Sequence, residues 1–325
     1  MLLTCCRAIV SILSRKVTLN QTASTHKSVF NIMRVFVTGA TGFIGSAVVK
    51  ELLNAGHQVL GLARSEQGAE ALIAAGAEVQ RGSLDDLDSL KKGATASDAV
   101  IHLAFIHDFS DYAGNCAKDR MAIEAIGDAL AGTDRPFIIT GGTLLLPSGQ
   151  LASEDTPPDL NRPNAIRGVA EQVALSFVPK GVRVSIIRLP PTNHGEGDHG
   201  FIAELARVAK STGVSAYPGD GLNRWAATHR LDTAKLYLLA LEKGTAGSIF
   251  HAVAEEGIPI KEIAEAIGKK LGIPTASKTA EHFGWLAIAI GIDNPIESVK
   301  TREQLGWTPV HASLISDIEA GVYTK

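Results

Sequence analysis

Three glycines between an expected strand and an expected helix constrain this chain more than any other feature. Residues 35–45 read VFVTGATGFIG, so Gly39, Gly42 and Gly45 follow a run rich in β-branched residues. The first glycine permits a tight turn, the second lets a pyrophosphate approach the backbone, and the third lets the helix pack against the strand. The N-terminus of that helix offers free N–H groups and a positive dipole end to phosphate. The loop therefore predicts a dinucleotide site, with further contacts from Thr41, Phe43 and Ile44.

Strands and helices alternate from Arg34 to Pro190. Strands are expected at Val35–Thr38, Gln58–Ala63, Glu78–Arg81, Ala99–Leu103, Pro136–Thr140 and Arg183–Leu189, and helices at Ser46–Asn54, Gln67–Ala75, Leu87–Lys92, Lys118–Ala131 and Gly168–Phe177. Such alternation predicts right-handed βαβ units and a parallel sheet covered on both faces. The expected fold class is α/β: a Rossmann-type doubly wound parallel sheet with a smaller C-terminal substrate lobe.

Beyond Pro190 the alternation of strands and helices is no longer regular. Gly/Pro-rich loops there separate the expected helices Ile202–Lys210, Asp232–Glu242 and Ile260–Leu271. We expect residues 33–190 to form the nucleotide-binding domain. Residues 191–325 are expected to form mostly the C-terminal lobe, with a part that returns to the first domain.

The end of the second expected strand indicates which nucleotide is preferred. Arg64 and Ser65 lie about 20 residues beyond the glycine loop, where a carboxylate would hold a ribose 2′-hydroxyl. A guanidinium and a hydroxyl suit a 2′-phosphate instead. The sequence predicts NADP(H) as the preferred cofactor, with NAD(H) as the alternative.

Composition and charge exclude several classes of protein. Hydrophobic residues make up 45% of the chain, which is typical of a globular protein. The net charge is −3, so we expect no nucleic-acid partner. No stretch reaches the ~20 apolar residues of a membrane helix, so no membrane partner is expected. Two of the three cysteines are Cys5 and Cys6, which leaves no cysteine framework for a disulfide scaffold or a zinc site.

Residues 1–32 differ from the rest of the chain. They contain four basic residues and no acidic ones, and their amphipathic pattern resembles a mitochondrial transit peptide. Met33 directly precedes a strand and could itself begin the protein, so the alternative is an extension without a structural role. The expected location is cytoplasmic, or mitochondrial if these residues act as a transit peptide.

Recurring sequence blocks identify a family. The segments Thr38–Gly45, Asp98–Ala104 and Arg188–Pro191 together resemble the extended short-chain dehydrogenase/reductase superfamily, which includes the NAD(P)-dependent epimerase/dehydratases. Further matches at His229–Asp232 and Leu305–Pro309 extend the resemblance over residues 33–325. The Gly-Leu-Ala-Arg-Ser end of the second strand is similar to an atypical, NmrA-like and epimerase-like subgroup. The resemblance implies a Rossmann sheet, a C-terminal lobe and a small-molecule substrate bound between them, and it leaves a homodimer open.

The resemblance also implies cofactor contacts at the ends of later strands. Ser83 and Leu84 are expected beside the adenine, although an Asp is more usual at position 83. Leu103 and Ala104 are expected beside the cofactor ribose. The loop Pro190–Asn193 is expected to face the nicotinamide carboxamide, with Pro190 and Thr192 as contacts.

The catalytic pattern departs from the family. Members normally use a Tyr with a Lys four residues later, often followed by a Glu. Here those three positions hold Pro163, Arg167 and Glu171. Proline cannot transfer a proton, and Arg167 can donate hydrogen bonds to a ribose but is a poor proton relay.

Other polar residues are therefore candidates for the proton transfer and for substrate binding. Thr140 and Thr143 fall where the family places its active-site Ser/Thr, and Tyr112 and His107 follow a cofactor-lining strand. Substrate contacts are expected from His194, Arg224 and Trp225. For Trp225 the alternative is a buried ring that anchors the lobe. His194 and His199 could bind a metal, but hydride transfer needs none, and no metal is expected.

Three functions remain open from the sequence. The leading hypothesis is an NADP(H)-dependent oxidoreductase that acts on a small carbonyl or alcohol. The first alternative is a non-catalytic NADP(H)-sensing protein, which the absence of Tyr at position 163 favours. The second is sugar-nucleotide epimerisation or dehydration, which depends on the missing Tyr/Lys pair.

Overall fold

The computed structural model describes residues 31–162 and 165–324, and residues 32–325 form one compact unit. The expectations for residues 1–30 and for Pro163 lie outside the described residues. Seven parallel strands form the main sheet in the order β10-β6-β5-β4-β1-β2-β3. These strands are β1 (Arg34–Thr38), β2 (Gln58–Ala63), β3 (Glu78–Arg81), β4 (Ala99–His102), β5 (Pro136–Gly142), β6 (Arg183–Leu189) and β10 (Ser248–His251).

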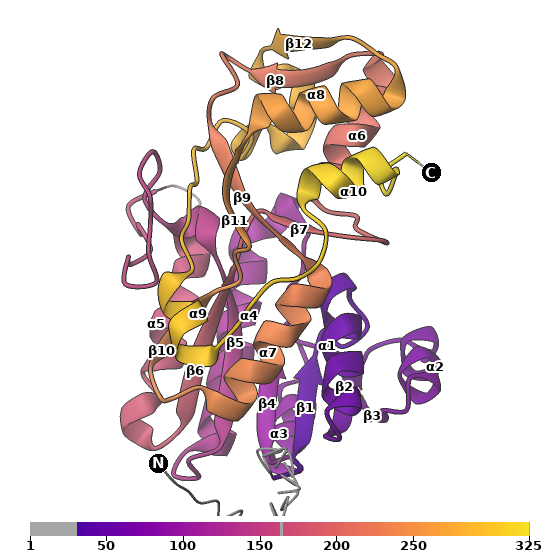
Figure 1. Ribbon diagram of the computed structural model, residues 1–325. Helices are drawn as coiled ribbons and strands as arrows, with labels where there is room; N and C mark the ends of the chain where they lie inside the picture. Colours follow the sequence, from indigo (N-terminus) through magenta and orange to yellow (C-terminus); the bar gives the residue numbers. More distant parts are fainter. Residues whose placement is uncertain (1–30, 163–164, 325) are drawn as a thin grey trace, which may run out of the picture. The chain divides into compact units, whose positions relative to one another are not determined.

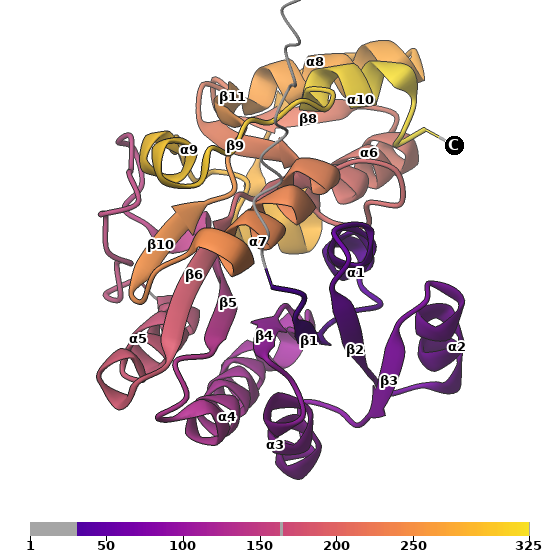
Figure 2. The same cartoon turned by 60° about the horizontal axis from the view of Figure 1, so that its bottom comes forward.

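Helices cover both faces of this sheet, as Figure 2 shows. Apolar side chains of one face pack with α1 (Phe43–Asn54), α2 (Glu66–Ala74), α7 (Arg230–Lys243) and α9 (Val299–Leu305). The other face packs with α3 (Leu87–Thr95), α4 (Tyr112–Leu130) and α5 (Val169–Leu175). Residues of β1 alternate between the two cores: Val35 and Val37 belong to one, and Phe36 to the other. The predicted Rossmann-type doubly wound sheet is confirmed.

The strand order reverses between β1 and β4, where a doubly wound sheet forms its ligand crevice at the carboxyl ends of the strands. The glycine loop follows β1 at this point. β7 (Thr192–His194) begins directly after Pro190 and Pro191, which follow the carboxyl end of β6. The lobe therefore starts at the same edge of the sheet as the glycine loop.

The lobe has its own sheets and core, in the upper part of Figure 1. A three-stranded sheet pairs β7 with β9 (Arg224–His229) and β9 with β11 (Glu255–Pro259). A two-stranded sheet pairs β8 (Ser215–Pro218) with β12 (Thr275–Lys278). Their apolar core includes side chains from α6 (Phe201–Thr212), α8 (Ile260–Leu271) and α10 (Leu314–Ala320).

Three details differ from the expectations. Helix α4 begins at Tyr112 rather than Lys118, because the Asp111 carboxylate accepts a hydrogen bond from Gly114 N (3.1 Å) and caps an earlier first turn. Helix α7, expected in the lobe, packs instead against the main sheet with α1. The short strands β7 to β12 were not predicted. Among the described residues, none of the helices is both long and apolar enough to cross a membrane.

Candidate active site

The glycine loop has the shape that a dinucleotide pyrophosphate requires. Gly39 has φ +67°, and a Cβ there would lie 2.7 Å from Ala104 N, so only glycine fits. A Cβ on Gly45 would collide with the Gly39 carbonyl oxygen. Gly42 precedes α1 without a side-chain cap, which leaves the first N–H groups of the helix for a ligand. The loop therefore fits the phosphates of a bound nucleotide, with Thr41 exposed and Phe43 and Ile44 half-buried around it.

The residue directly after β2, Arg64, has a guanidinium that is not paired with any described residue. Arg64 is exposed, and among the described residues it has no hydrogen bond or ion pair. The neighbouring Ser65 caps α2 by accepting a hydrogen bond from Gly68 N (3.1 Å). Arg81 donates to the carbonyl of Ser65 (3.0 Å) and pairs with Glu66 (2.6 Å). Arg64 is thus the cation here that remains available to a ligand.

The strand ends expected near the adenosine lie along the same edge. Leu84 lies in the segment after β3 and is buried. In the same segment the Ser83 carbonyl accepts a hydrogen bond from Asp86 N (3.2 Å). Leu103 N and Ala104 N donate to the backbone and side chain of Thr38, respectively. These bonds hold the loop after β4 against the glycine loop. The contacts of these residues with a cofactor remain predictions.

Three side chains gather around Phe105, which lies three residues after the end of β4. The Arg167 guanidinium lies over the Phe105 ring at 3.8 Å from its centroid. The rings of His107 and Tyr112 contact Phe105 edge-on at centroid distances of 5.1 and 6.4 Å. Arg167 Nε is buried and has no hydrogen-bond partner among the described residues. The structure therefore brings together three of the predicted polar residues, although Arg167 lies 55 residues beyond Tyr112 in the chain.

Their surroundings determine which of these groups carries a proton. Burial, together with the positive charge of Arg167, lowers the pKa of His107 to about 4, so its imidazole is neutral at pH 7. Burial raises the pKa of Tyr112 to about 12, so its phenol keeps its proton. The neighbouring thiol of Cys116 also has a raised pKa because of burial. At neutral pH the phenol of Tyr112 and the thiol of Cys116 therefore both keep their protons.

Thr140, within β5, and Thr143, directly after it, are both hydrogen-bonded to other protein groups. Thr140 Oγ1 donates to the His102 carbonyl (2.8 Å) and lies 2.7 Å from Tyr237 Oη, from which it accepts. Thr143 is fully buried, and its hydroxyl donates to Asn294 Oδ1 (2.8 Å). Neither hydroxyl donates toward the Phe105 cluster in this arrangement. Sequence reasoning missed Tyr237 and Asn294, whose helix and loop carry no motif that distinguishes them.

The expected family glutamate lies apart from this cluster. Glu171 is buried and accepts hydrogen bonds from Arg188 Nε (3.1 Å) and Nη2 (2.8 Å). Arg188 Nη1 also donates to the Thr156 carbonyl (2.8 Å). This buried pair ties α5 to β6 and leaves Glu171 without a free oxygen for proton transfer.

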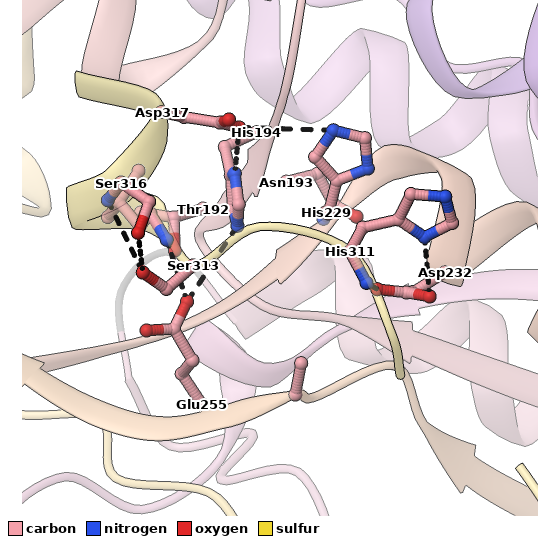
Figure 3. Close-up of polar contacts among 12 residues, drawn as sticks. Thr192, Asn193, His194, His229, Asp232, Glu255, His311, Ser313, Ser316 and Asp317 are labelled. Carbon is pink, nitrogen blue, oxygen red and sulfur yellow. Dashed lines mark hydrogen bonds and ion pairs between the residues drawn. The ribbon is translucent and has the colours of Figure 1, made fainter. Parts of the chain in front are cut away.

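The lobe residues expected to touch substrate are mostly enclosed. Pro190 and Thr192 are buried, and the Thr192 hydroxyl donates to the Ala226 carbonyl. His194 is fully buried and its Nδ1 lies 2.6 Å from Asp317 Oδ2 (Figure 3). Trp225 has no exposed surface, so neither face of its ring is open to a substrate.

Arg224 is also committed within the lobe, because its guanidinium pairs with Asp293 (2.8 Å). Trp225 packs against Phe201 with a centroid distance of 5.4 Å, which is the arrangement that an anchoring role requires. Among the described residues, no group of three or more His, Cys, Asp or Glu side chains is arranged to hold a metal ion. Of the predicted catalytic residues, His107 and Tyr112 are the two that lie together around Phe105.

The match to a family model decides what kind of protein carries this site. Residues 35–253 match the NAD dependent epimerase/dehydratase family. The chain belongs to this epimerase/dehydratase family. The description of this family names NAD, a dinucleotide, which agrees with the cradle formed by Gly39, Gly42 and Gly45.

The chain is similar to other proteins over nearly its whole length. An uncharacterized protein of Schizosaccharomyces pombe is 53% identical over 296 residues, which cover 90% of this chain and 100% of that protein. A ketoreductase for 4-hydroxy-2-methyl-3-oxo-4-farnesyl-3,4-dihydroquinoline-1-oxide from Stigmatella aurantiaca is 23% identical, covering 85% of this chain and 92% of its own. The UDP-glucose 4-epimerase of Thermotoga maritima shares the fold, with a TM-score of 0.73, 20% identity, and coverage of 90% of this chain and 98% of that one.

Proposed function

We propose that this epimerase/dehydratase-family chain is an NADP(H)-dependent oxidoreductase that interconverts a small carbonyl compound and its alcohol. The observation that carries the proposal is the cluster of Tyr112, His107 and Arg167 around Phe105, next to the strand end that lines the cofactor crevice. The cluster supplies a protonated phenol and a fixed cation, although the usual Tyr/Lys pair is absent. The ketoreductase among the relatives supports the same reaction type.

The nicotinamide, when bound, supplies or accepts the hydride. Tyr112 donates a hydrogen bond to the substrate oxygen and passes its proton to that oxygen as the carbonyl is reduced. Its pKa of about 12 keeps the phenol protonated before the reaction. Arg167 is held over Phe105 and has an unpartnered Nε, so it can donate to a ribose hydroxyl of the cofactor or to the substrate. Neutral His107 can accept or donate one hydrogen bond and thereby orient the substrate.

Preference for NADP(H) follows from the charges at the end of β2. Arg64 is exposed and has no partner among the described residues, whereas Arg81 is already paired with Glu66. A 2′-phosphate would give Arg64 a charge-assisted hydrogen bond, which a 2′-hydroxyl cannot match. This argument supports NADP(H) and leaves NAD(H) as the weaker ligand.

A non-catalytic NADP(H) sensor is the second candidate function. It is favoured by Thr143, because the hydroxyl at the position of the family's active-site Ser/Thr is buried and bonded to Asn294. A sensor would bind the nucleotide and turn over no substrate. Sugar-nucleotide epimerisation is less favoured, because the protein lacks the Tyr/Lys pair on which that chemistry relies.

The deciding experiment combines binding with turnover. The full chain is titrated with NADPH, NADP⁺ and NADH by nucleotide fluorescence and calorimetry, and is then assayed for NADPH oxidation with a panel of aldehydes and ketones. Tight NADPH binding with turnover supports the oxidoreductase. Tight binding of NADP⁺ without turnover of any carbonyl supports the sensor, and failure to bind any nucleotide removes both functions.

A further inference from the structure

Arg230 places a positive charge beside the glycine loop. It is the first residue of α7, and its guanidinium carbon lies 4.9 Å from the centroid of the Phe43 ring. Phe43 is the first residue of α1, directly after Gly42. The guanidinium therefore lies near the N-terminus of α1, whose free N–H groups and positive dipole end suit a phosphate.

The loop of residues 195–200 holds this guanidinium from the lobe side. Arg230 Nη1 donates to the Glu196 carbonyl (3.0 Å), and Arg230 forms no ion pair with any carboxylate of a described residue. Gly195 and Gly197 have φ of +131° and +83°, and a Cβ on Gly195 would lie 3.3 Å from Arg230 Cγ. The two glycines thus let the loop backbone follow the arginine closely.

Two residues of the C-terminal segment, Asp317 and Tyr323, in turn hold this loop. Before the loop, His194 Nδ1 lies 2.6 Å from Asp317 Oδ2 of α10, and His229 Nε2 lies 3.9 Å from the same oxygen (Figure 3). Within the loop, Asp198 Oδ2 accepts a hydrogen bond from Tyr323 Oη (2.8 Å). The His199 ring then contacts Phe43 edge-on at 6.0 Å. Loop and arginine are therefore held against the glycine loop by contacts distant in sequence.

We propose that Arg230 binds the pyrophosphate of the nicotinamide cofactor, together with the N–H groups at the start of α1. A guanidinium matches two phosphate oxygens, and its charge adds to the positive end of the helix dipole. The residue contacts the group shared by NADPH and NADH, whereas Arg64 is proposed to contact only the 2′-phosphate. The inference rests on the nucleotide binding of the proposed function, but it does not depend on catalytic turnover.

The test is nucleotide binding by Arg230→Gln and Arg230→Lys in the full chain. Dissociation constants for NADPH and for NADH are measured by fluorescence titration at low and high salt. Arg230→Gln is expected to weaken both nucleotides about tenfold and by the same factor. Because salt screens an exposed charge, the loss should shrink at high salt. Arg230→Lys should retain part of the affinity and the salt dependence of the unmodified protein.

Two control variants separate a phosphate contact from a loss of structure. Lys235→Gln removes a cation from the same helix that pairs with Glu51 (3.1 Å), and it should leave both dissociation constants unchanged. Tyr323→Phe removes the hydrogen bond that holds Asp198 but keeps the charge of Arg230, so the salt dependence of nucleotide binding should persist.

The proposal would be overturned if Arg230→Gln bound both nucleotides as tightly as the unmodified protein. A loss of affinity confined to NADPH would also overturn it. A loss that neither salt nor lysine changes would also overturn it, because such a loss reports a structural role. If the unmodified protein binds no nucleotide, the proposed function fails with it.

Discussion

At the scale of single residues, the proposed proton donor and the cation near it come from different segments of the chain. By the resemblance, the positions of the family's tyrosine and lysine hold Pro163 and Arg167. The guanidinium at 167 reaches over Phe105, so the cation at the position of the family lysine lies beside the ring of Tyr112 at the start of α4. A cation and a phenol are thus present together, but they come from segments that the usual motif does not join.

The first prediction concerns Tyr112. Replacement by Phe removes the phenolic proton but keeps the ring against Phe105, so turnover of a carbonyl substrate should fall about 100-fold, the lower range for a general acid. The dissociation constant for NADPH should not change, because the hydroxyl is not proposed to contact the cofactor. Steady-state kinetics and fluorescence titration measure the two effects separately.

The matched control is His107→Gln, which changes a second polar group of the same cluster. Because the imidazole is already neutral at pH 7, this change should affect KM more than kcat. Unchanged kcat in Tyr112→Phe would exclude the phenol as the proton donor.

The second prediction concerns Arg64. Arg64→Asp replaces the free cation at the end of β2 by a carboxylate that repels a 2′-phosphate and can accept a hydrogen bond from a 2′-hydroxyl. NADPH binding should weaken by more than about tenfold, and NADH binding should stay the same or improve. Calorimetric titration with both nucleotides tests this, and equal losses for the two would contradict the assignment.

At the scale of elements, the sequence predicted the first domain well because its signals are local. Most strands from β1 to β6 contain a short apolar run, and glycines such as Gly56 and Gly76 mark the turns after two of the helices. The strands of the lobe are only three to six residues long, and they pair with partners far away in the chain. Their formation depends on those pairings rather than on local periodicity, so no window of the sequence indicates them.

The candidate site was predicted in part for the same reason. Glycine spacing locates the cofactor loop, but spacing cannot tell that Trp225 is buried or that Asp317 binds the His194 imidazole. Likewise, Arg230 has no motif of its own, and its place beside Phe43 follows only from the packing of α7 against α1. Residue type predicts what a side chain can do, whereas long-range packing decides which side chains meet.

The third prediction concerns the attachment of α10. Asp317→Ala leaves the buried His194 without its hydrogen-bond partner, so the free energy of unfolding should fall by about 1–3 kcal/mol. Urea denaturation of the full chain measures the change. Ser316→Ala, on the same helix but exposed, should shift the unfolding midpoint very little. A negligible loss in Asp317→Ala would mean that the His194–Asp317 contact does not hold the helix.

At the scale of the whole molecule, the main sheet and the C-terminal segment share one buried polar network. His251, at the carboxyl end of β10, donates from Nδ1 to the Glu297 carbonyl (2.8 Å), and its Nε2 lies 3.4 Å from Arg188 Nη1. Thr301 of α9 donates to the carboxylate of Glu154 and accepts a hydrogen bond from His251 N. The network links β6, β10 and α9, so its protonation state affects the stability of the entire sheet edge.

The fourth prediction follows from this network. Burial lowers the pKa of His251 from 6.5 to about 4. This effect outweighs the Glu297 carbonyl and the Glu154 carboxylate, which both raise the pKa, and the Arg188 guanidinium adds a small lowering effect of its own. Between those two pH values the unfolded chain binds a proton that the folded protein does not. The stabilisation from neutral His251 is therefore complete above about pH 6.5 and is lost as the pH falls toward 4.

Thermal unfolding of the full chain should accordingly show Tm falling steadily from about pH 7 to about pH 4.5. His251→Gln keeps a hydrogen-bonding side chain of similar size but cannot bind a proton in this range. The variant should be less stable at neutral pH, because the packing of the imidazole is lost, yet its Tm should fall less steeply with pH. Parallel pH profiles for the two proteins would show that other groups cause the acid instability and that His251 contributes nothing to it.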